Sequence, residues 1–149
     1  MKSADLSDFE GNADFDSAFK SAPEGPGVYF LRLKSGKTFP RINGETDIVY
    51  IGSSKNLKRR FNQYCNPGST QWTNRKVNRF VKEYGHDSEF FWKKISSDKI
   101  KIEEYNLLRR FEQEHHEKPP LNGADSRFLK SEFQEDLHIV DNGITTNNI

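Results

Sequence analysis

The sequence contains almost no cysteine and no long apolar segment. Cys65 is the one cysteine among 149 residues, which excludes an internal disulfide and a zinc site built from thiolates. No apolar run reaches the roughly 20 residues that a membrane-spanning helix needs. The N-terminal stretch carries scattered acids, unlike a signal peptide. These absences predict a cytoplasmic protein that does not bind a membrane.

Acidic residues are missing from one long stretch of an otherwise balanced chain. The net charge is only +1, from 23 basic and 22 acidic residues, yet no Asp or Glu lies between Ile48 and Lys82. A solvated helical surface normally mixes both signs of charge. A block of one sign instead indicates a surface that binds a polyanion such as a nucleic acid. The residues expected to contact nucleic-acid phosphates are Lys55, Lys58, Arg59, Arg75, Lys76, Arg79 and Lys82.

Apolar residues are also scarce, at 33% of the chain with a mean hydropathy of −0.90, so the core is modest and the length fits one domain. Proline, glycine and charge patterns divide the chain into three parts. Residues 1–23 are expected to form an N-terminal arm with a short helix around 15–20. Residues 24–123 form the domain, and residues 124–149 form a partly disordered C-terminal tail.

Within the domain, hydrophobic periodicity predicts elements in the order β-β-α-α-β-α. Turn residues, including the Asn43-Gly44 pair, indicate an elaborated hairpin between the first two strands, and Ser53 or Ser54 is expected to cap the next helix. A small sheet with helices is an α+β fold. The expected elements span residues 27–34, 47–52, 55–65, 73–84, 88–96 and 101–116.

The first helix of the domain places a permanent cation beside its apolar face. At about 100° per residue, Arg60 lies within about 60° of Leu57 and Tyr64, whereas Arg59 points the opposite way. One interpretation is that the charged head of Arg60 extends to water while its stem packs on the core. The other is that it faces an anionic group, because burying an unpaired guanidinium is costly. The acid-free surroundings favour the second interpretation.

The last helix raises the same question with the opposite sign. Glu104 falls in the middle of an apolar stripe, where a carboxylate is costly unless it is paired or binds a metal. A structural ion pair with Arg60 is one interpretation. The other is a ligand for Mg²⁺, which keeps most of its waters and needs few carboxylates. The stripe that includes Glu104 is formed by Leu107, Leu108, Phe111 and His115.

Two tyrosines in the predicted strands add possible hydrogen-bonding groups. Tyr29 ends the first tripeptide GVY and Tyr50 opens the second tripeptide YIG. If the strands pair in antiparallel fashion, both hydroxyls could lie on one side of the sheet. Ordinary aromatic packing is the alternative. A buried hydroxyl still needs a partner, and a phosphate or an attacking water would serve.

Taken together, these residues resemble the GIY-YIG nuclease family over residues 27–122. Each tripeptide alone is a weak signal, whereas the ordered set is specific. The matching positions are GVY at 27–29, YIG at 50–52, Arg60, Tyr64, Glu104 in an E-x-x-L-L helix and Asn122 in PPLN.

The resemblance implies a three-stranded antiparallel sheet flanked by helices, and metal-dependent hydrolysis of DNA phosphodiester bonds with Mg²⁺ or Mn²⁺. By position, Arg60 would stabilise the charge that develops on the scissile phosphate. Glu104 would hold the metal. These two residues would therefore share the charge of the transition state.

The resemblance also implies roles in proton transfer and positioning. Tyr29 or Tyr50 would activate the attacking water, and the family favours Tyr29 as the base. Tyr64 would assist the proton transfer, and Asn122 would tie the last segment to the site by hydrogen bonds. All of these residues are catalytic candidates.

The sequence departs from the family pattern at three places, and the first is a connection between the two tripeptides that is longer than in compact members. Ser53 stands where excision-repair relatives often carry a lysine, so the identity of the base stays open between the two tyrosines. Glu104 lies farther from the PPLN segment than is usual, so Glu103 or Glu112 is an alternative metal ligand. The apolar stripe favours Glu104.

Little sequence lies outside the predicted domain to recognise a target. Sequence-specific cleavage would therefore need a homodimer or a partner chain. The alternative function is a non-catalytic nucleic-acid-binding module that retains the fold, and a third is a structural protein in which Arg60 and Glu104 form a buried ion pair.

Overall fold

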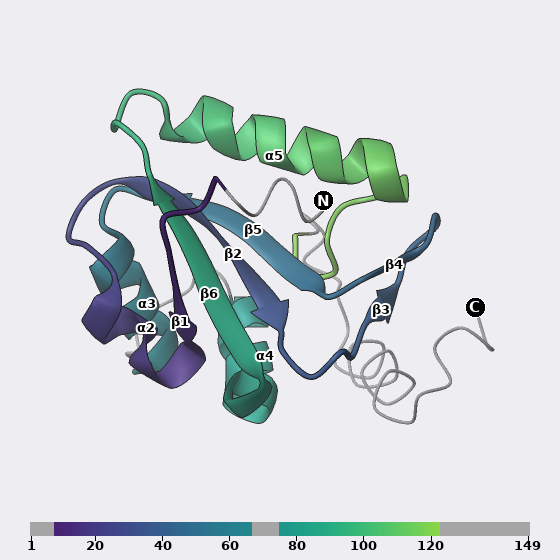
Figure 1. Cartoon of the computed structure of the whole chain (residues 1–149), viewed down its shortest axis with the longest axis horizontal. Helices are drawn as coiled ribbons and strands as arrows, with labels where there is room; N and C mark the ends of the chain where they lie inside the picture. Colours follow the sequence, from purple (N-terminus) through teal and green to yellow (C-terminus); the bar gives the residue numbers. More distant parts are fainter. Residues whose placement is uncertain (1–7, 67–74, 123–149) are drawn as a thin grey trace.

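The computed structural model describes residues 8–66 and 75–122, which form an α+β fold around a four-stranded antiparallel sheet (Figure 1). The strand order is β1-β6-β2-β5. The tail expected at 124–149 lies outside the described residues. The elements are β1 (Gly11–Asp14), α2 (Phe15–Ser21), β2 (Gly27–Leu33), β3 (Phe39–Pro40), β4 (Glu45–Thr46), β5 (Ile48–Ser54), α3 (Leu57–Cys65), α4 (Arg75–Tyr84), a 3₁₀ turn (Gly85–Asp87), β6 (Ser88–Lys94) and α5 (Ile100–His115).

The α+β class and the predicted order of the six domain elements are confirmed. The sheet, however, has four strands instead of the expected three, and the additional strand is β1. Strand β1 pairs in antiparallel fashion with β6, so that Gly11 lies opposite Trp92. A side chain at position 11 would collide with the Trp92 ring, because its Cβ would lie 2.5 Å from the indole. The residues expected to form an arm therefore extend the sheet through β1 and contribute the expected helix α2 to the core.

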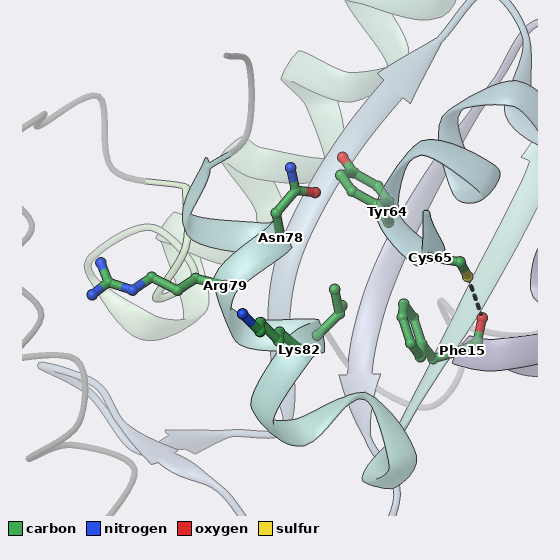
Figure 2. A pocket seen from close by; sticks show the side chains of 7 residues that line it. Phe15, Tyr64, Cys65, Asn78, Arg79 and Lys82 are labelled. Atoms are coloured by element: carbon green, nitrogen blue, oxygen red, sulfur yellow. Dashed lines mark hydrogen bonds between the residues drawn. The ribbon is translucent and has the colours of Figure 1, made fainter. Parts of the chain in front are cut away.

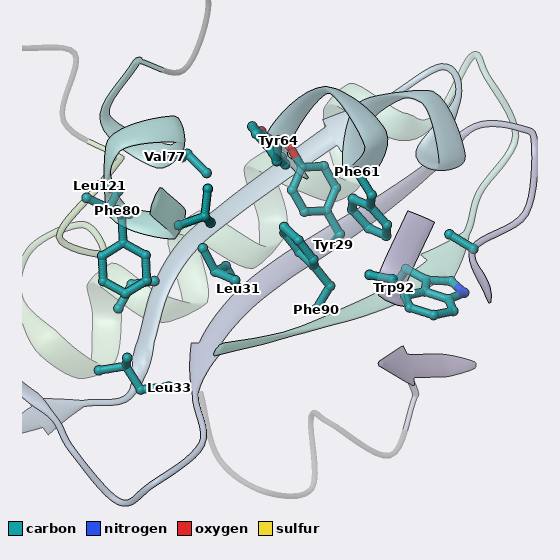
Figure 3. Close-up of a cluster of buried hydrophobic side chains, with 14 of the residues drawn as sticks. Tyr29, Leu31, Leu33, Phe61, Tyr64, Val77, Phe80, Phe90, Trp92 and Leu121 are labelled. Carbon is teal, nitrogen blue, oxygen red and sulfur yellow. Dashed lines mark hydrogen bonds between the residues drawn. The ribbon is translucent and has the colours of Figure 1, made fainter. Parts of the chain in front are cut away.

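The sheet separates two apolar clusters. On one face, side chains of β2 and β6 pack against α2, α3 and α4. Figure 3 shows the part of this cluster that α3 and α4 contribute. On the other face lies α5, whose Leu107 and Phe111 pack against Val28 and Phe30 of β2 (Figure 1). Because both faces are covered, β2 is apolar without the alternation of a half-exposed strand. Within the described ranges, no helix combines the length and the apolar character needed to cross a bilayer.

The predicted hairpin connection between β2 and β5 is confirmed, and it is fastened to the end of α5. Its strands β3 and β4 meet at a turn where Gly44 has a φ of +79°, a conformation that favours glycine. The backbone N–H of Asn43 donates to the carbonyl of His115 at 3.0 Å. The His115 ring, which is buried as part of the apolar stripe, contacts the Asn43 carbonyl through Nδ1 at 2.9 Å.

Helix α3 begins with a different cap from the one expected. Asn56, rather than Ser53 or Ser54, is the N-cap, and its side chain accepts a hydrogen bond from the Arg59 N–H at 3.0 Å. Ser54 instead binds the cap residue itself, because its hydroxyl accepts a hydrogen bond from the Asn56 N–H. Asparagine caps as well as serine does, so residue type alone could not decide between neighbouring positions.

Candidate active site

The register of the two central strands places both motif tyrosines on one face of the sheet. Tyr29 lies opposite Gly52, and Leu31 lies opposite Tyr50. Directly opposite residues of an antiparallel pair share a face, and so do residues two apart on one strand. The two tyrosine rings are 6.1 Å apart between centroids. Their side chains therefore point to the side of the sheet that α3 covers.

Glycine is required at the key position of each tripeptide by close packing. A Cβ at Gly52 would lie 2.8 Å from the Tyr29 hydroxyl and 2.7 Å from the Tyr50 ring. A Cβ at Gly27 would lie 2.5 Å from the Lys93 carbonyl and 2.6 Å from Leu57. The first glycine therefore lets α3 approach the sheet, and the second makes room for the two tyrosines.

A short hydrogen bond joins Tyr29 of β2 to Tyr64 of α3. Their hydroxyl oxygens are 2.6 Å apart, and the two residues are 0% and 2% exposed. The Tyr29 ring is held by edge contacts to Phe61 and Phe90, at centroid distances of 5.2 and 5.9 Å, and Figure 3 shows these rings grouped beneath α3. This packing fixes the direction of both hydroxyls.

Arg60 turns its guanidinium toward these hydroxyls. It is half-buried and forms a hydrogen bond with Tyr64, one turn later on α3. Burial lowers its pKa, but the neighbouring oxygens of Tyr29 and Tyr64 more than offset this, so the Arg60 pKa is raised overall. The head group therefore faces the tyrosines instead of simply extending to water. No ion pair between Arg60 and Glu104 is formed in the described structure, so the structural ion pair is not what turns them inward.

Glu104 reaches the same region from the opposite helix layer. Its side chain is 25% exposed, and one carboxylate oxygen accepts a hydrogen bond from the Ser53 hydroxyl at the end of β5. The same oxygen lies 3.9 Å from the amine of the exposed Lys101. The negative charge of Glu104 contributes to raising the pKa of Tyr50 and of Tyr64. Glu104 therefore acts electrostatically on the tyrosine cluster.

The two alternative carboxylates have other surroundings. Glu103 lies 3.4 Å from the Lys93 amine, with which it forms an ion pair. Glu112 is exposed on α5. Neither contributes to the pKa shifts of the three tyrosines, whereas Glu104 contributes to two of them. Of the three carboxylates, Glu104 is therefore the one that acts on the tyrosine cluster.

Burial is the largest influence on the three phenols. It raises the pKa of Tyr29 well above its ordinary value, and it raises the pKa values of Tyr50 and Tyr64 as well. The charge of Arg60 acts in the opposite direction on all three. All three phenols are therefore protonated at neutral pH.

This shift predicts a difference in alkaline stability between the wild type and Tyr29→Phe. A pKa raised by folding gives stability that is fully present below the unfolded value near 10 and is lost as the pH rises above it. At pH 8 we expect Tyr29→Phe to be less stable by about 1 kcal/mol, for the lost hydrogen bond. From pH 10 to 11, denaturant unfolding should show this difference shrinking by up to about 1 kcal/mol. Tyr105→Phe, at an exposed tyrosine, is the matched control. A constant difference for Tyr29→Phe across this range would contradict the expectation.

Asn122 fastens the segment after α5 to the outer edge of β5. Its Nδ2 donates to the carbonyl of Ile51, and its Oδ1 accepts from the Ile51 N–H, both at 2.8 Å. The preceding residue, Leu121, donates its N–H to the Val49 carbonyl at 2.9 Å. The backbone between Tyr50 and Gly52 is thereby held by a side chain 71 positions away.

The predicted DNA-contacting residues lie on α3, on α4 and just before α3, the helices that cover the tyrosine face. Lys58 donates to the carbonyl of Lys20 on α2 at 3.2 Å, and Lys76 is half-buried. Arg75 is the first residue of α4. Among those whose burial is described, the exposed members are Lys55, Arg59, Arg79 and Lys82. These four place positive charge on the surface of the same helix layer as Arg60.

Two residues of this region were not identified from the sequence. The Ser53 hydroxyl donates to the Glu104 carboxylate. Because side chains alternate between the two faces of a strand, Ser53 lies on the face opposite to Gly52, toward α5, and this alternation is the signal that the sequence offered. Asn78 of α4 is half-buried and lines a pocket. No local pattern signals that pocket, which three helices form together.

A model of the GIY-YIG catalytic domain matches residues 26–118, which include both tripeptides, Arg60, Tyr64 and Glu104. The chain belongs to this family. The resemblance inferred from the ordered motifs is therefore confirmed, and membership implies a nuclease domain, whose reaction is phosphodiester hydrolysis.

Curated relatives are similar over a shorter stretch. UvrABC system protein C from two strains of Rhodopseudomonas palustris, BisB5 and HaA2, is 33% identical over 57 residues. This covers 38% of the chain but only 7% of the length of these curated relatives.

Among solved structures, the GIY-YIG N-terminal endonuclease domain of UvrC from Thermotoga maritima is 24% identical and covers 83% of this chain. The TM-score is 0.47 for a point mutant bound to the catalytic divalent cation and 0.46 for the magnesium-bound form. The match covers 99% and 100% of those chains.

Proposed function

We propose that this GIY-YIG protein is a DNA endonuclease that uses Mg²⁺ or Mn²⁺ to hydrolyse phosphodiester bonds. The observation that carries the proposal is the convergence of unlike groups from four elements. The hydroxyl of Tyr29 on β2 meets the hydroxyl of Tyr64 and the cation of Arg60 on α3. The carboxylate of Glu104 on α5 lies near enough to shift the pKa of Tyr50 on the edge strand β5. A phosphate with a metal ion needs these kinds of partner at one place.

Glu104 fits a hard cation. In the described part of the chain, no three His, Cys, Asp or Glu side chains cluster as a ligand set. A protein zinc site needs three or four such ligands, whereas Mg²⁺ keeps several waters and accepts one carboxylate plus phosphate oxygens. Glu104 would hold the ion, with its carboxylate oriented by Ser53. When bound, the ion would polarise the phosphate and stabilise the leaving oxygen.

Arg60 would bind the non-bridging oxygens of the scissile phosphate. Its planar guanidinium can donate two parallel hydrogen bonds to a phosphate. The bond to Tyr64 and the half-buried stem restrict its orientation before DNA binds. Donors fixed in advance stabilise the charge that develops in the transition state without further reorganisation.

The paired hydroxyls would handle the proton of the attacking water, with Tyr29 as the base. A phenol must lose its own proton before it can accept one, and burial opposes that loss in Tyr29. The charge of Arg60 favours the phenolate, and so would a nearby metal ion. Through the 2.6 Å bond, Tyr29 would pass its own proton to Tyr64 as it takes one from the water, and Tyr64, which contacts Arg60, would release its proton to the leaving oxygen.

Metal removal tests the proposal directly. We expect purified protein to nick supercoiled plasmid and branched DNA in Mg²⁺ or Mn²⁺, and EDTA to abolish nicking. Gel electrophoresis of the plasmid forms measures the outcome. The double variant Arg60→Ala, Glu104→Ala, purified in parallel, controls for contaminating nuclease. DNA binding in a gel shift without any nicking would contradict the proposal and support the non-catalytic binding module.

A further inference from the structure

A second group of basic residues lies where β6 leads into α5. The connecting stretch KKISSDKIK, at 93–101, contains four lysines and one acid. Figure 1 shows this connection at the end of the sheet where β2 begins, with α5 running back over the sheet. The acid-free stretch on which the predicted DNA contacts depend ends at Lys82, so this positive charge is separate from it in sequence.

Ion pairs within the protein do not neutralise these lysines. Lys93 forms one with Glu103 at 3.4 Å, but Lys94 and Lys99 are exposed and form none with any residue that the structure describes. Asp98, the single acid of the stretch, is exposed as well. A surface that only needs hydration normally mixes both signs of charge. The excess of exposed positive charge therefore indicates an anionic partner.

The strand register places Lys94 near the end of β5. Lys94 lies opposite Gly27, and Gly27 lies opposite Ser54. Neighbouring strands are about 4.8 Å apart, so roughly 10 Å separates the backbone of Lys94 from that of Ser54. Lys94 is on the α3 side of the sheet, because Gly27 precedes Tyr29 by two residues. Its charge is therefore close to that of Lys55, which directly follows β5.

Lys101 extends this positive charge to the candidate active site. Its amine lies 3.9 Å from the Glu104 carboxylate. Lys99 directly precedes α5, and at 1.5 Å per residue it lies roughly 7 to 8 Å from Glu104 along the helix axis. The second basic surface, which consists of Lys94, Lys99 and Lys101, therefore runs around the end of the sheet from the α3 side to α5.

The first basic surface lies on α3 and α4, which cover the other face of the sheet from α5. Figure 2 shows Arg79 extending outward from α4, with Lys82 on the same helix. A phosphate bound between Arg60 of α3 and Glu104 of α5 would have positive charge on either side of it. DNA continues in both directions from an internal phosphate, with one negative charge per about 1.7 Å of duplex. An endonuclease must therefore hold duplex on both sides of the cut.

We propose that Lys94, Lys99 and Lys101 bind the backbone of double-stranded DNA on one side of the scissile phosphate, while α3 and α4 bind it on the other. Lysine meets a phosphate as a point charge, so these contacts position the duplex and read no bases. This inference rests on the proposed function, because it places the DNA by reference to the phosphate between Arg60 and Glu104.

The salt dependence of DNA binding tests this surface without any cleavage. Each phosphate contact that is lost makes the slope of log affinity against log salt concentration shallower by about 0.9. For the full-length double variant Lys94→Gln, Lys99→Gln in EDTA, we expect a slope shallower by about 2. At about 0.15 M salt its affinity should be about 10- to 30-fold weaker. Fluorescence anisotropy of a labelled duplex of about 30 base pairs measures both quantities.

The matched control is the double variant Lys34→Gln, Lys118→Gln. Both lysines are exposed, and they lie at the opposite end of the sheet, where β2 and α5 end. Lys34 pairs with the exposed Asp14 at 3.1 Å, and such surface pairs contribute little to stability. The control removes the same two charges, so it should keep the slope of the wild type. Thermal unfolding of both variants checks that the fold is retained.

The outcomes separate this inference from the proposed function. An unchanged slope in Lys94→Gln, Lys99→Gln, an equal change in the control, or no DNA binding by the wild type would overturn the second basic surface, even if plasmid is nicked. A shallower slope in that variant alone, with no metal-dependent nicking by the wild type, would support the second basic surface and overturn the endonuclease.

Discussion

Arg60→Lys is expected to lower the rate of DNA cleavage by about 10²- to 10³-fold, the cost of removing one fixed transition-state donor. Lysine keeps the positive charge but not the planar fork, so it cannot hold two phosphate oxygens and the Tyr64 hydroxyl at once. Single-turnover cleavage at saturating protein measures the chemical step. The affinity for DNA should change much less, because a single charge is conserved.

Arg109→Lys provides the matched control for this substitution. Arg109 is exposed on α5, where it donates to the Tyr105 hydroxyl. Its replacement should leave the cleavage rate unchanged. If Arg60→Lys cleaves at the wild-type rate as well, Arg60 has no part in stabilising the transition state, and its inward orientation serves packing alone.

Glu104→Gln is expected to lower cleavage by about 10²- to 10⁴-fold, corresponding to the several kcal/mol that a metal ion contributes to charge stabilisation. Glutamine has the same shape and can still accept the hydrogen bond from Ser53, so the fold is preserved. What is lost is the negative charge that a hard cation requires. A Mg²⁺ titration of the cleavage rate measures this, and half-saturation should move to a higher concentration.

Two neighbouring carboxylates on α5 make this test specific. Glu112→Gln removes an exposed carboxylate and should leave both the rate and the Mg²⁺ dependence unchanged. Glu103→Gln breaks the ion pair with Lys93 and is expected to affect stability rather than metal binding. A loss of Mg²⁺ dependence in Glu103→Gln but not in Glu104→Gln would move the metal ligand by one position and contradict the assignment.

The parts of the fold and site that are dictated by local patterns could be predicted from the sequence. Strands β2, β5 and β6 follow from short apolar runs, because strands buried on both faces need apolar residues throughout. The inward orientation of Arg60 follows from the helical period, since a residue three after Leu57 and four before Tyr64 must lie on the buried side. The two tripeptides place their tyrosines on one face of the sheet only because antiparallel pairing sets Tyr29 opposite Gly52.

The parts that depend on distant neighbours could not be predicted. Strand β1 has the sequence GNAD, which disfavours a strand, and it pairs with β6 because Gly11 leaves room for the Trp92 ring. The hydrogen bond from Ser53 to Glu104 joins residues 51 positions apart. The pocket beside Asn78 needs three helices at once, so no single helical pattern contains it.

The bonds that Leu121 and Asn122 make to the outside of β5 have a consequence for self-association. Strand β5 is a terminal strand of the sheet, and an unoccupied rim of this kind is a template on which another chain can add a strand and begin to aggregate. Here the protein covers the N–H and C=O groups of Ile51 and the carbonyl of Val49 with its own later residues. The outer edge of the strand that carries the motif tripeptide is thereby closed to β-augmentation by other molecules. Its inner edge pairs with β2, which carries Tyr29.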